Sequence, residues 1–169
     1  IYMILGLDVS TSKIGYCVID DNQNLLLFGF IKFKKEPFEE RAWDFFTNTL
    51  KEIDHKYKIK EVRIEEPFSM FSGGKTTAGT MSKLQRFNGM ISLMAYRCFH
   101  MIPILVPSRS ARSKCGIKIK RGENTKKKVI EWVAARFPKD FKFELTRHGN
   151  PKPGTDDMAD SIVVALSHF

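Results

Sequence analysis

The chain has 169 residues, the usual size of one domain, and 43% of them are hydrophobic. We therefore expect it to bury a core without disulfide bridges. Lys and Arg outnumber Asp and Glu by 28 to 19, so the formal net charge is +9 and the isoelectric point is near 9.5. This balance favours an anionic partner, either a nucleic acid or a membrane surface. No stretch approaches the ~20 apolar residues of a membrane-spanning helix, so we expect none.

The number and spacing of the cysteines indicate a reducing cellular compartment. Cys17, Cys98 and Cys115 are an odd number of thiols without Cys-x-x-Cys spacing. This pattern favours reduced thiols over disulfides or a zinc site. The apolar run at residues 1–7 lacks the basic region that begins a secretion signal. We therefore expect a soluble protein of the cytoplasm.

The first half of the chain predicts three strands, a helix and a fourth strand. Apolar runs at residues 3–9, 14–19 and 25–33 are separated by short polar turns, which is typical of an antiparallel meander. Residues 37–57 carry apolar side chains at helical spacing with charges between them, which predicts one amphipathic helix. A short strand follows at residues 62–65 and ends before a proline.

The second half alternates between loops, helices and one strand. Residues 68–80, FSMFSGGKTTAGT, have the composition of a mobile loop, and residues 81–99 form an apolar stripe broad enough for a helix with two partners. A strand is predicted at residues 102–106, followed by a basic, loop-like segment at 108–128. Two further helices are expected, one capped by Asn124 and running through 137, the other capped by Thr155 and covering 156–168.

This order of elements, βββαβαβαα, predicts an α/β fold. Three antiparallel strands followed by alternating helices and strands suggest a mixed five-stranded sheet with helices on both faces, in which right-handed crossovers form the parallel part. In that topology the first and fourth strands lie side by side. Asp8 and Glu65, at the ends of those strands, would then sit at the same edge of the sheet.

Four acidic residues occupy positions where a negative charge is expected to be unfavourable unless a partner compensates it. Asp8 and Glu65 interrupt apolar strands, where an unpaired charge is costly. Asp157 and Asp160 are three apart on a helix and share a face, whereas Asp156 should point elsewhere. Three of these acids have a structural alternative: Asp8 could cap the STSK turn, and the helical pair could be the usual acidic bias of a first turn.

Together the acids favour a hard cation, because three separate segments each supply a carboxylate at an element end that the topology brings together. Ligation by oxygen without histidine suits Mg²⁺, with Mn²⁺ as the alternative, better than zinc. Two such ions can activate water and stabilise the leaving oxygen when a phosphodiester is cleaved.

At these residues the chain resembles the RuvC family of Holliday-junction resolvases, within the RNase H-like nuclease superfamily, and especially its bacteriophage versions. The matching pieces are ILGLDVSTSKIGYCVID, RIEEPF and DDMADSIVVALSH, in the order and spacing of the family. The resemblance covers nearly the whole chain. It implies one RNase H-like nuclease domain over residues 1–169 and a metal-dependent endonuclease that resolves Holliday junctions or other branched DNA by paired cuts. It also implies a homodimer with two active sites, located in the host cytoplasm if a phage encodes it.

The resemblance also assigns roles to single residues. The catalytic and metal-binding set, with two ions per site, would be Asp8, Glu65, Asp157 and Asp160. Lys126, in the run KIKRGENTKKK, resembles a functional lysine near the scissile phosphate and would be a fifth catalytic residue, able to stabilise the charge that develops on that phosphate. Phe68 is similar in position to an aromatic that meets unpaired bases at the junction centre, and an ordinary core phenylalanine is the alternative. The remaining DNA-contact candidates are the basic residues Arg109, Arg112, Lys118, Lys120 and Lys127.

Two other functions compete with the nuclease. The segment GLDVSTSKIGYCVID also resembles the first phosphate loop of ATP-binding proteins of the actin, sugar-kinase and Hsp70 type, although no second phosphate loop follows. A non-catalytic nucleic-acid binder, in which the acids are structural, is the other alternative. Metal-dependent cleavage of branched DNA would separate both from the nuclease.

Overall fold

The computed structural model describes residues 1–67 and 77–169. Its centre is one five-stranded sheet in the order β3-β2-β1-β4-β5. The strands are β1 (Met3–Val9), β2 (Lys13–Asp20), β3 (Leu25–Lys32), β4 (Ile59–Glu65) and β5 (Ile104–Val106). The first three pair antiparallel, whereas β4 runs parallel to both β1 and β5. The predicted mixed sheet is confirmed, including the adjacent first and fourth strands.

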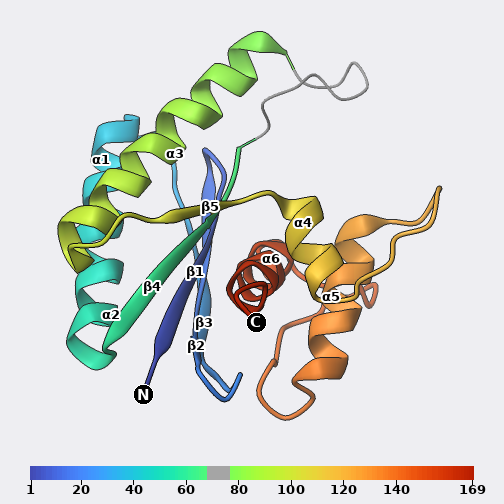
Figure 1. Cartoon of the computed structure of the whole chain (residues 1–169). Coiled ribbons are helices and arrows are strands. Elements are labelled where there is room, and N and C mark those ends of the chain that lie inside the picture. The colour runs from blue at the N-terminus through green and yellow to red at the C-terminus, as the bar shows by residue number, and fades with distance from the viewer. Residues whose placement is uncertain (68–76) are drawn as a thin grey trace.

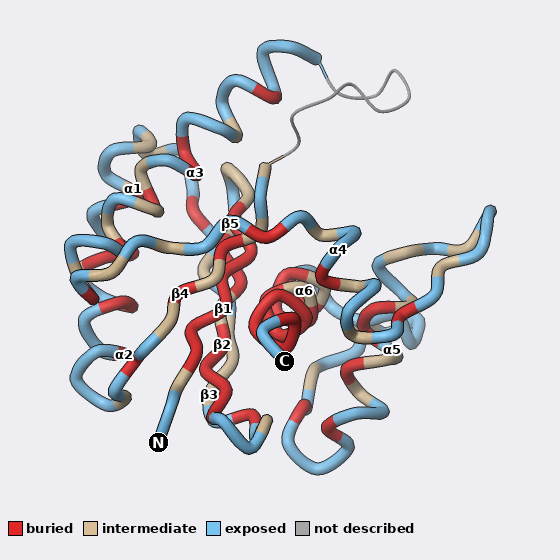
Figure 2. Tube along the Cα trace, in the orientation of Figure 1, coloured by how far each residue is buried: buried red, intermediate tan, exposed pale blue. Residues whose placement is uncertain are grey.

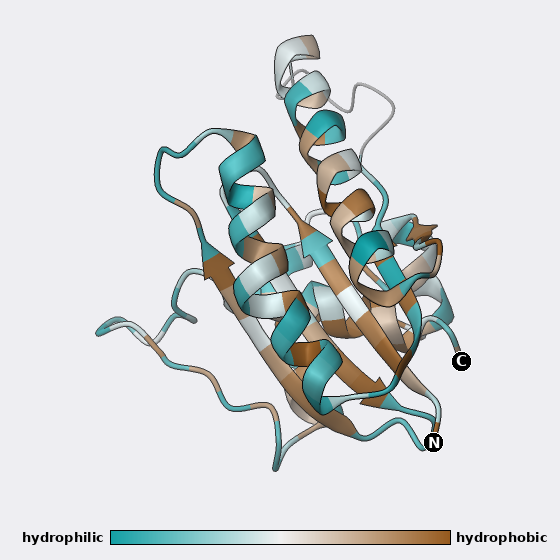
Figure 3. Ribbon diagram, turned by 90° about the vertical axis from the view of Figure 1, so that its left-hand side faces the viewer, coloured by the Kyte–Doolittle hydropathy of each residue, from teal (hydrophilic) through white to brown (hydrophobic). Residues whose placement is uncertain are grey.

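Helices cover both faces of the sheet (Figure 1). One layer, toward the viewer in Figure 3, consists of α1 (Phe38–Asp44), η1 (Phe45–Leu50), α2 (Lys51–Lys56) and α3 (Ala78–Phe99). The other layer consists of α4 (Ser108–Lys114), α5 (Thr125–Arg136) and α6 (Thr155–Leu166). No helix of residues 1–67 and 77–169 is long and apolar enough to cross a membrane.

The alternation of β1 divides its side chains between the two layers. Leu5 and Leu7 belong to the core beneath α1–α3, while Ile4 belongs to the core around α6. Asp8 has the same parity as Ile4, so it faces the α6 layer. Helix α6 lies deepest in that layer, and nearly all of its residues are buried (Figure 2).

Two helices differ from their predicted form. The helix expected over residues 37–57 is continuous, but η1 in its middle has π-helical hydrogen bonding, which a regular 3.6-residue pattern does not reveal. The basic segment expected to be a loop contains α4, whose one buried residue is Ala111. A single buried side chain leaves no periodic signal, and packing against α6 stabilises this turn of helix.

The predicted caps of the last two helices have different outcomes. Asn124 caps α5, because its side chain accepts a hydrogen bond from the Lys127 backbone, as expected. The prediction for α6 was wrong by one residue: Gly154 is the N-cap, and the Thr155 hydroxyl donates to the carbonyl of Lys152. Gly154 has a φ of 100°, a left-handed conformation that favours glycine.

Candidate active site

Asp8 and Glu65 lie next to each other at the ends of two parallel strands. The register pairs Leu7 with Ile64, so the following residue of each strand continues the same row. Their carboxyl groups share a hydrogen bond, and Asp8 is only 7% exposed. The convergence expected from the topology is therefore present.

The end of β4 is held in place by two contacts that the sequence did not suggest. The side-chain amide of Asn88, a buried residue of α3, donates to the carbonyl of Glu65 at 3.1 Å. The backbone nitrogen of Glu66 donates to the carbonyl of Val106 at 2.8 Å. These two contacts fix the backbone of Glu65 and Glu66 at the point where the chain leaves the sheet. A buried Asn in an apolar helical stripe was the signal that could have revealed this role.

Helix α6 approaches the sheet closely because two strand residues have no side chain. A β-carbon on Gly15 would overlap with the carbonyl group of Asp157, and one on Gly6 would lie 2.8 Å from the β-carbon of Ala165. This packing brings the first turn of α6 against β1 and β2. Asp157 and Asp160, which share a face as predicted, are thereby brought to the edge where Asp8 ends.

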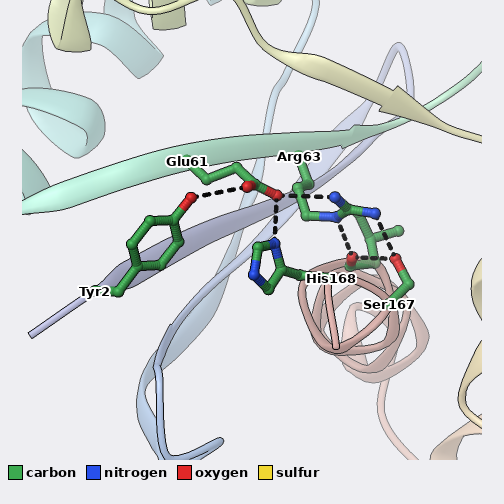
Figure 4. A network of polar contacts seen from close by, with 6 residues as sticks. Tyr2, Glu61, Arg63, Ser167 and His168 are labelled. Carbon is green, nitrogen blue, oxygen red and sulfur yellow. Dashed lines mark hydrogen bonds and ion pairs between the residues drawn. The ribbon is translucent and has the colours of Figure 1, made fainter.

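The opposite end of α6 is anchored to β4 by a polar network (Figure 4). The Arg63 guanidinium donates to the carbonyl of Val164 and to the hydroxyl of Ser167, both at 3.1 Å. It also pairs with Glu61, which contacts His168 at 3.0 Å. A cation at a helix C-terminus is favourable to the helix dipole. The network therefore fixes α6 at the end remote from its acidic first turn.

The four predicted acids line one pocket of about 430 Å³. Lys126, the predicted catalytic lysine, and Arg112, a predicted DNA contact, line it as well. So does Asp156, which was expected to point elsewhere. That expectation was wrong because Asp156 precedes Asp157 at the mouth of the pocket and forms an ion pair with Lys126 at 2.9 Å.

Three of the remaining predicted DNA-contact residues, Arg109, Lys118 and Lys127, line hollows that adjoin this pocket. Arg109 and Lys118 line a neighbouring hollow of about 560 Å³, which shares Arg112 with the pocket. Lys127 lines a different hollow, and Lys120 is exposed. Phe68 lies outside the described residues.

The structure speaks against a capping role for Asp8. In the STSK turn, Ser10 and not Asp8 makes the capping contacts: its hydroxyl donates to the Lys13 carbonyl at 2.9 Å and accepts from the Lys13 nitrogen at 3.1 Å. The carboxyl group of Asp8 faces Glu65 instead.

The family model of the crossover junction endodeoxyribonuclease RuvC matches residues 4–168. The chain belongs to the RuvC family. The RuvC of Aliarcobacter butzleri is 29% identical over 168 residues, covering 98% of this chain and 96% of that protein. The RuvC of Campylobacter hominis is 26% identical, covering 98% and 94%.

A solved RuvC structure has the same fold. RuvC of Thermus thermophilus, in complex with Holliday junction substrate, superposes with a TM-score of 0.69 at 18% identity, covering 99% of this chain and 92% of that one. The RNase H-like fold predicted from the sequence is therefore confirmed. The predicted family and enzyme class, a crossover junction endodeoxyribonuclease that resolves Holliday junctions, are confirmed by the family assignment. The phage origin stays a prediction.

RuvC nucleases are metal-dependent, and the donor set of this pocket suits a hard cation. All four predicted ligands are carboxylates, and close carboxylates repel one another unless protons or cations lie between them. Within residues 1–67 and 77–169, no three metal-ligating side chains converge on one point. Asp8 and Glu65 share a hydrogen bond instead, and with Asp157 and Asp160 they are the carboxylates that would hold an ion in this pocket.

The pKa values of these clustered acids are shifted by burial and by the charges of their neighbours. Burial, the hydrogen bond with Glu65 and the neighbouring acids raise the pKa of Asp8 well above its usual value. Burial and the charges of Glu65, Asp156 and Asp157 raise the pKa of Asp160 to about 8. Although burial raises the pKa of Asp156, contact with Lys126 lowers it overall. The raised pKa values favour the protonated forms of Asp8 and Asp160, and a bound cation would instead favour their carboxylate forms.

These shifts predict a stability that depends on pH and metal together. A carboxyl group whose pKa is raised by folding binds its proton more tightly in the folded state. It stabilises the fold below its unfolded pKa of about 4, and that contribution is lost as pH rises toward 8. We expect the Tm in EDTA to fall across this range, and excess Mg²⁺ to suppress the fall by binding the deprotonated acids. Calorimetry at several pH values tests this, and equal pH profiles with and without Mg²⁺ would contradict it.

Proposed function

We propose that this RuvC-family nuclease cuts four-way DNA junctions with two Mg²⁺ ions per site, Mn²⁺ being the alternative ion. The ligands would be Asp8, Glu65, Asp157 and Asp160. The observation that carries the proposal is that these acids, drawn from three distant segments, line one pocket, in which Asp8 and Asp157 are buried and Glu65 and Asp160 are half-buried. Structural acids would not be expected to gather away from water without cations to compensate them.

The four carboxylates would hold the cations, and the basic residues would hold the DNA. The four carboxylates would fix the cation positions relative to the rigid sheet edge. When bound, the ions supply activation of water and stabilisation of the leaving oxygen. Lys126, paired with Asp156 at the pocket mouth, would turn to the scissile phosphate and stabilise the charge that develops on it.

DNA would lie across the basic residues that surround the pocket. Arg112 lines the pocket itself, and Arg109 and Lys118 line the adjoining hollow. Phosphate contacts from such residues orient a duplex without reading its sequence. Lys120 and Lys127 would extend this surface, and Phe68 would meet the bases at the junction centre. The Thermus thermophilus RuvC was solved with a Holliday junction, the substrate we propose here.

The deciding experiment compares three synthetic substrates. A four-way junction, a fork and a linear duplex are incubated with the protein, each with Mg²⁺ and with EDTA. We expect paired, symmetric nicks in the junction only, and only with Mg²⁺. Cleavage that survives EDTA would overturn the metal mechanism, and equal cleavage of the linear duplex would overturn junction selectivity.

We propose that residues 1–169 act as one nuclease domain in the cytoplasm, the host's if a phage encodes it, and work as a homodimer. A four-way junction has two-fold symmetry and needs two cuts, so a two-fold dimer matches it. Exposed apolar side chains on α3 and β5 are available for such a dimer. On α3, Leu93 is 59% exposed and Tyr96 is 49% exposed, and Ile104 and Leu105 on the edge strand β5 are also exposed.

The dimer can be tested by placing a charge on this surface. We expect Leu93→Asp to give a monomer, because a carboxylate buried between two helices would lose its hydration without a partner. Light scattering measures the mass, and junction cleavage should change from paired to single nicks. Leu26→Asp on β3 is the matched control, because Leu26 is also an exposed leucine but lies on the other edge strand. A Leu93→Asp protein that stays dimeric would place the interface elsewhere.

A further inference from the structure

Lys13 is a residue beside the candidate active site to which the family resemblance assigns no role. It begins β2, and its backbone is fixed to Ser10 by three hydrogen bonds, which include the Ser10 nitrogen donating to the Lys13 carbonyl at 2.9 Å. Ser10 follows Asp8 by two residues. The turn therefore holds the base of the lysine side chain at a set place relative to the end of β1.

The Lys13 ammonium group lies near the acidic cluster but donates no hydrogen bond to its carboxylates. Its Nζ is 4.0 Å from a carboxylate oxygen of Asp157, and its side chain is only 24% exposed. At that distance the two charges attract each other, but no hydrogen bond forms. Within residues 1–67 and 77–169 the ammonium has no hydrogen-bond acceptor. A partly buried cation with all three donors available is suited to bind an anion.

Lys13 also lines a hollow that adjoins the active-site pocket. We call this hollow, of about 560 Å³, the lysine groove. It shares Lys126 and Asp156 with the pocket. Its defining residues are four lysines and two of its apolar side chains: Lys13, Lys126, Lys127, Lys152, Phe143 and Leu145.

The positive charge and the apolar side chains of the lysine groove suit the binding of a single DNA strand. Its four lysines face two acids, Glu131 and Asp156, so its charge is positive, whereas the pocket holds six acids against two basic residues. A phosphate next to the one at the cations would be repelled by the acidic walls of the pocket. At the border of the groove it would meet Lys13. The apolar side chains beyond would contact sugar and base.

We infer that Lys13 binds the phosphate adjacent to the one that is cut, and that the cleaved strand continues past it into the lysine groove. This inference rests on the proposed function. It makes Lys13 a substrate-positioning residue, and it differs from a purely structural role in which the lysine only neutralises Asp157.

The test combines a protein variant with a change in the DNA. Wild type and Lys13→Ala are compared on a four-way junction in which single phosphates, one or two positions to either side of the scissile one, are replaced by neutral methylphosphonates. For the wild type we expect one position to raise KM about tenfold, which corresponds to the loss of one charge-assisted hydrogen bond. For Lys13→Ala on unmodified DNA we expect a similar rise, with little change in kcat.

The decisive outcome is the coupling between the two changes. At the contacted position the methylphosphonate should have no further effect on Lys13→Ala, because the interaction is already lost. The slope of log affinity against log salt concentration should fall by about 1 in the variant. Lys13→Arg, which keeps the charge, should restore most of the affinity. Lys56→Ala is the control, since Lys56 pairs with Glu52 on α2, in the helix layer across the sheet.

Two results would overturn the inference. Additive effects at every position would show that Lys13 touches none of these phosphates, and a fall in kcat alone would show that it acts only through Asp157. The methylphosphonate scan on the wild type needs no variant, so a poorly folded Lys13→Ala protein would not prevent the test. Wild-type cleavage of unmodified DNA in Mg²⁺ checks the proposed function separately.

Discussion

Asp8→Asn and Glu65→Gln are each expected to abolish cleavage of a four-way junction while leaving junction binding within about twofold. Each substitution removes a charge from the buried pair but keeps its size and a hydrogen bond between the two side chains. An amide is a weaker ligand for a hard cation than a carboxylate. Loss of an essential cation ligand should therefore lower the rate by at least about a thousandfold, a loss typical of groups that act on the reacting atoms.

The measurement separates binding from chemistry. Junction affinity is measured in EDTA, and single-turnover cleavage is measured after Mg²⁺ is added. Asp54→Asn is the matched control, because Asp54 is an exposed acid of α2 in the helix layer on the other side of the sheet. Unchanged cleavage by either active-site variant would remove that residue from the mechanism. Loss of binding in EDTA would instead indicate a structural role.

Gly15→Ala is expected to cause the second largest loss although it adds a single methyl group. That group would overlap with the Asp157 carbonyl and lie 2.9 Å from the Met158 nitrogen. Both are backbone atoms of the first turn of α6, so the helix must move away from β2. Overpacking of this kind destabilises a fold by about 1–3 kcal/mol. A shift of about 1 Å in Asp157 can lower kcat by about a hundredfold.

The control for this variant is Gly79→Ala in the first turn of α3. Among residues 1–67 and 77–169, a β-carbon there would meet only the hydroxyl of Thr77, at 3.9 Å, so we expect stability to be kept or slightly raised. Calorimetry and single-turnover cleavage measure both variants. If Gly15→Ala kept full activity, the close approach of α6 to the sheet would not be what positions the acids.

Apart from α4, the order of elements could be predicted from the sequence, and so could the places of the main acids. Short apolar runs mark β1 and β4, and each run ends on a carboxylate that would be costly to bury without a partner. Because parallel strands joined by a crossover have matching ends, Asp8 and Glu65 could be placed together without coordinates. The three-residue spacing of Asp157 and Asp160 likewise fixes a shared helix face.

Only the tertiary structure decided how these pieces meet. Helical periodicity predicts the direction of Asp156 around the axis of α6, but it does not predict which residues lie beside Asp156. The ion-pair partner of Asp156, Lys126, comes from another helix, α5. The contacts of Asn88 and Lys13, and the methyl-free surface at Gly15, depend on distances between elements that lie far apart in the chain. Local patterns encode which face of an element is apolar. The separation and register of packed elements follow from many side chains filling one volume together, which no single segment of the sequence records.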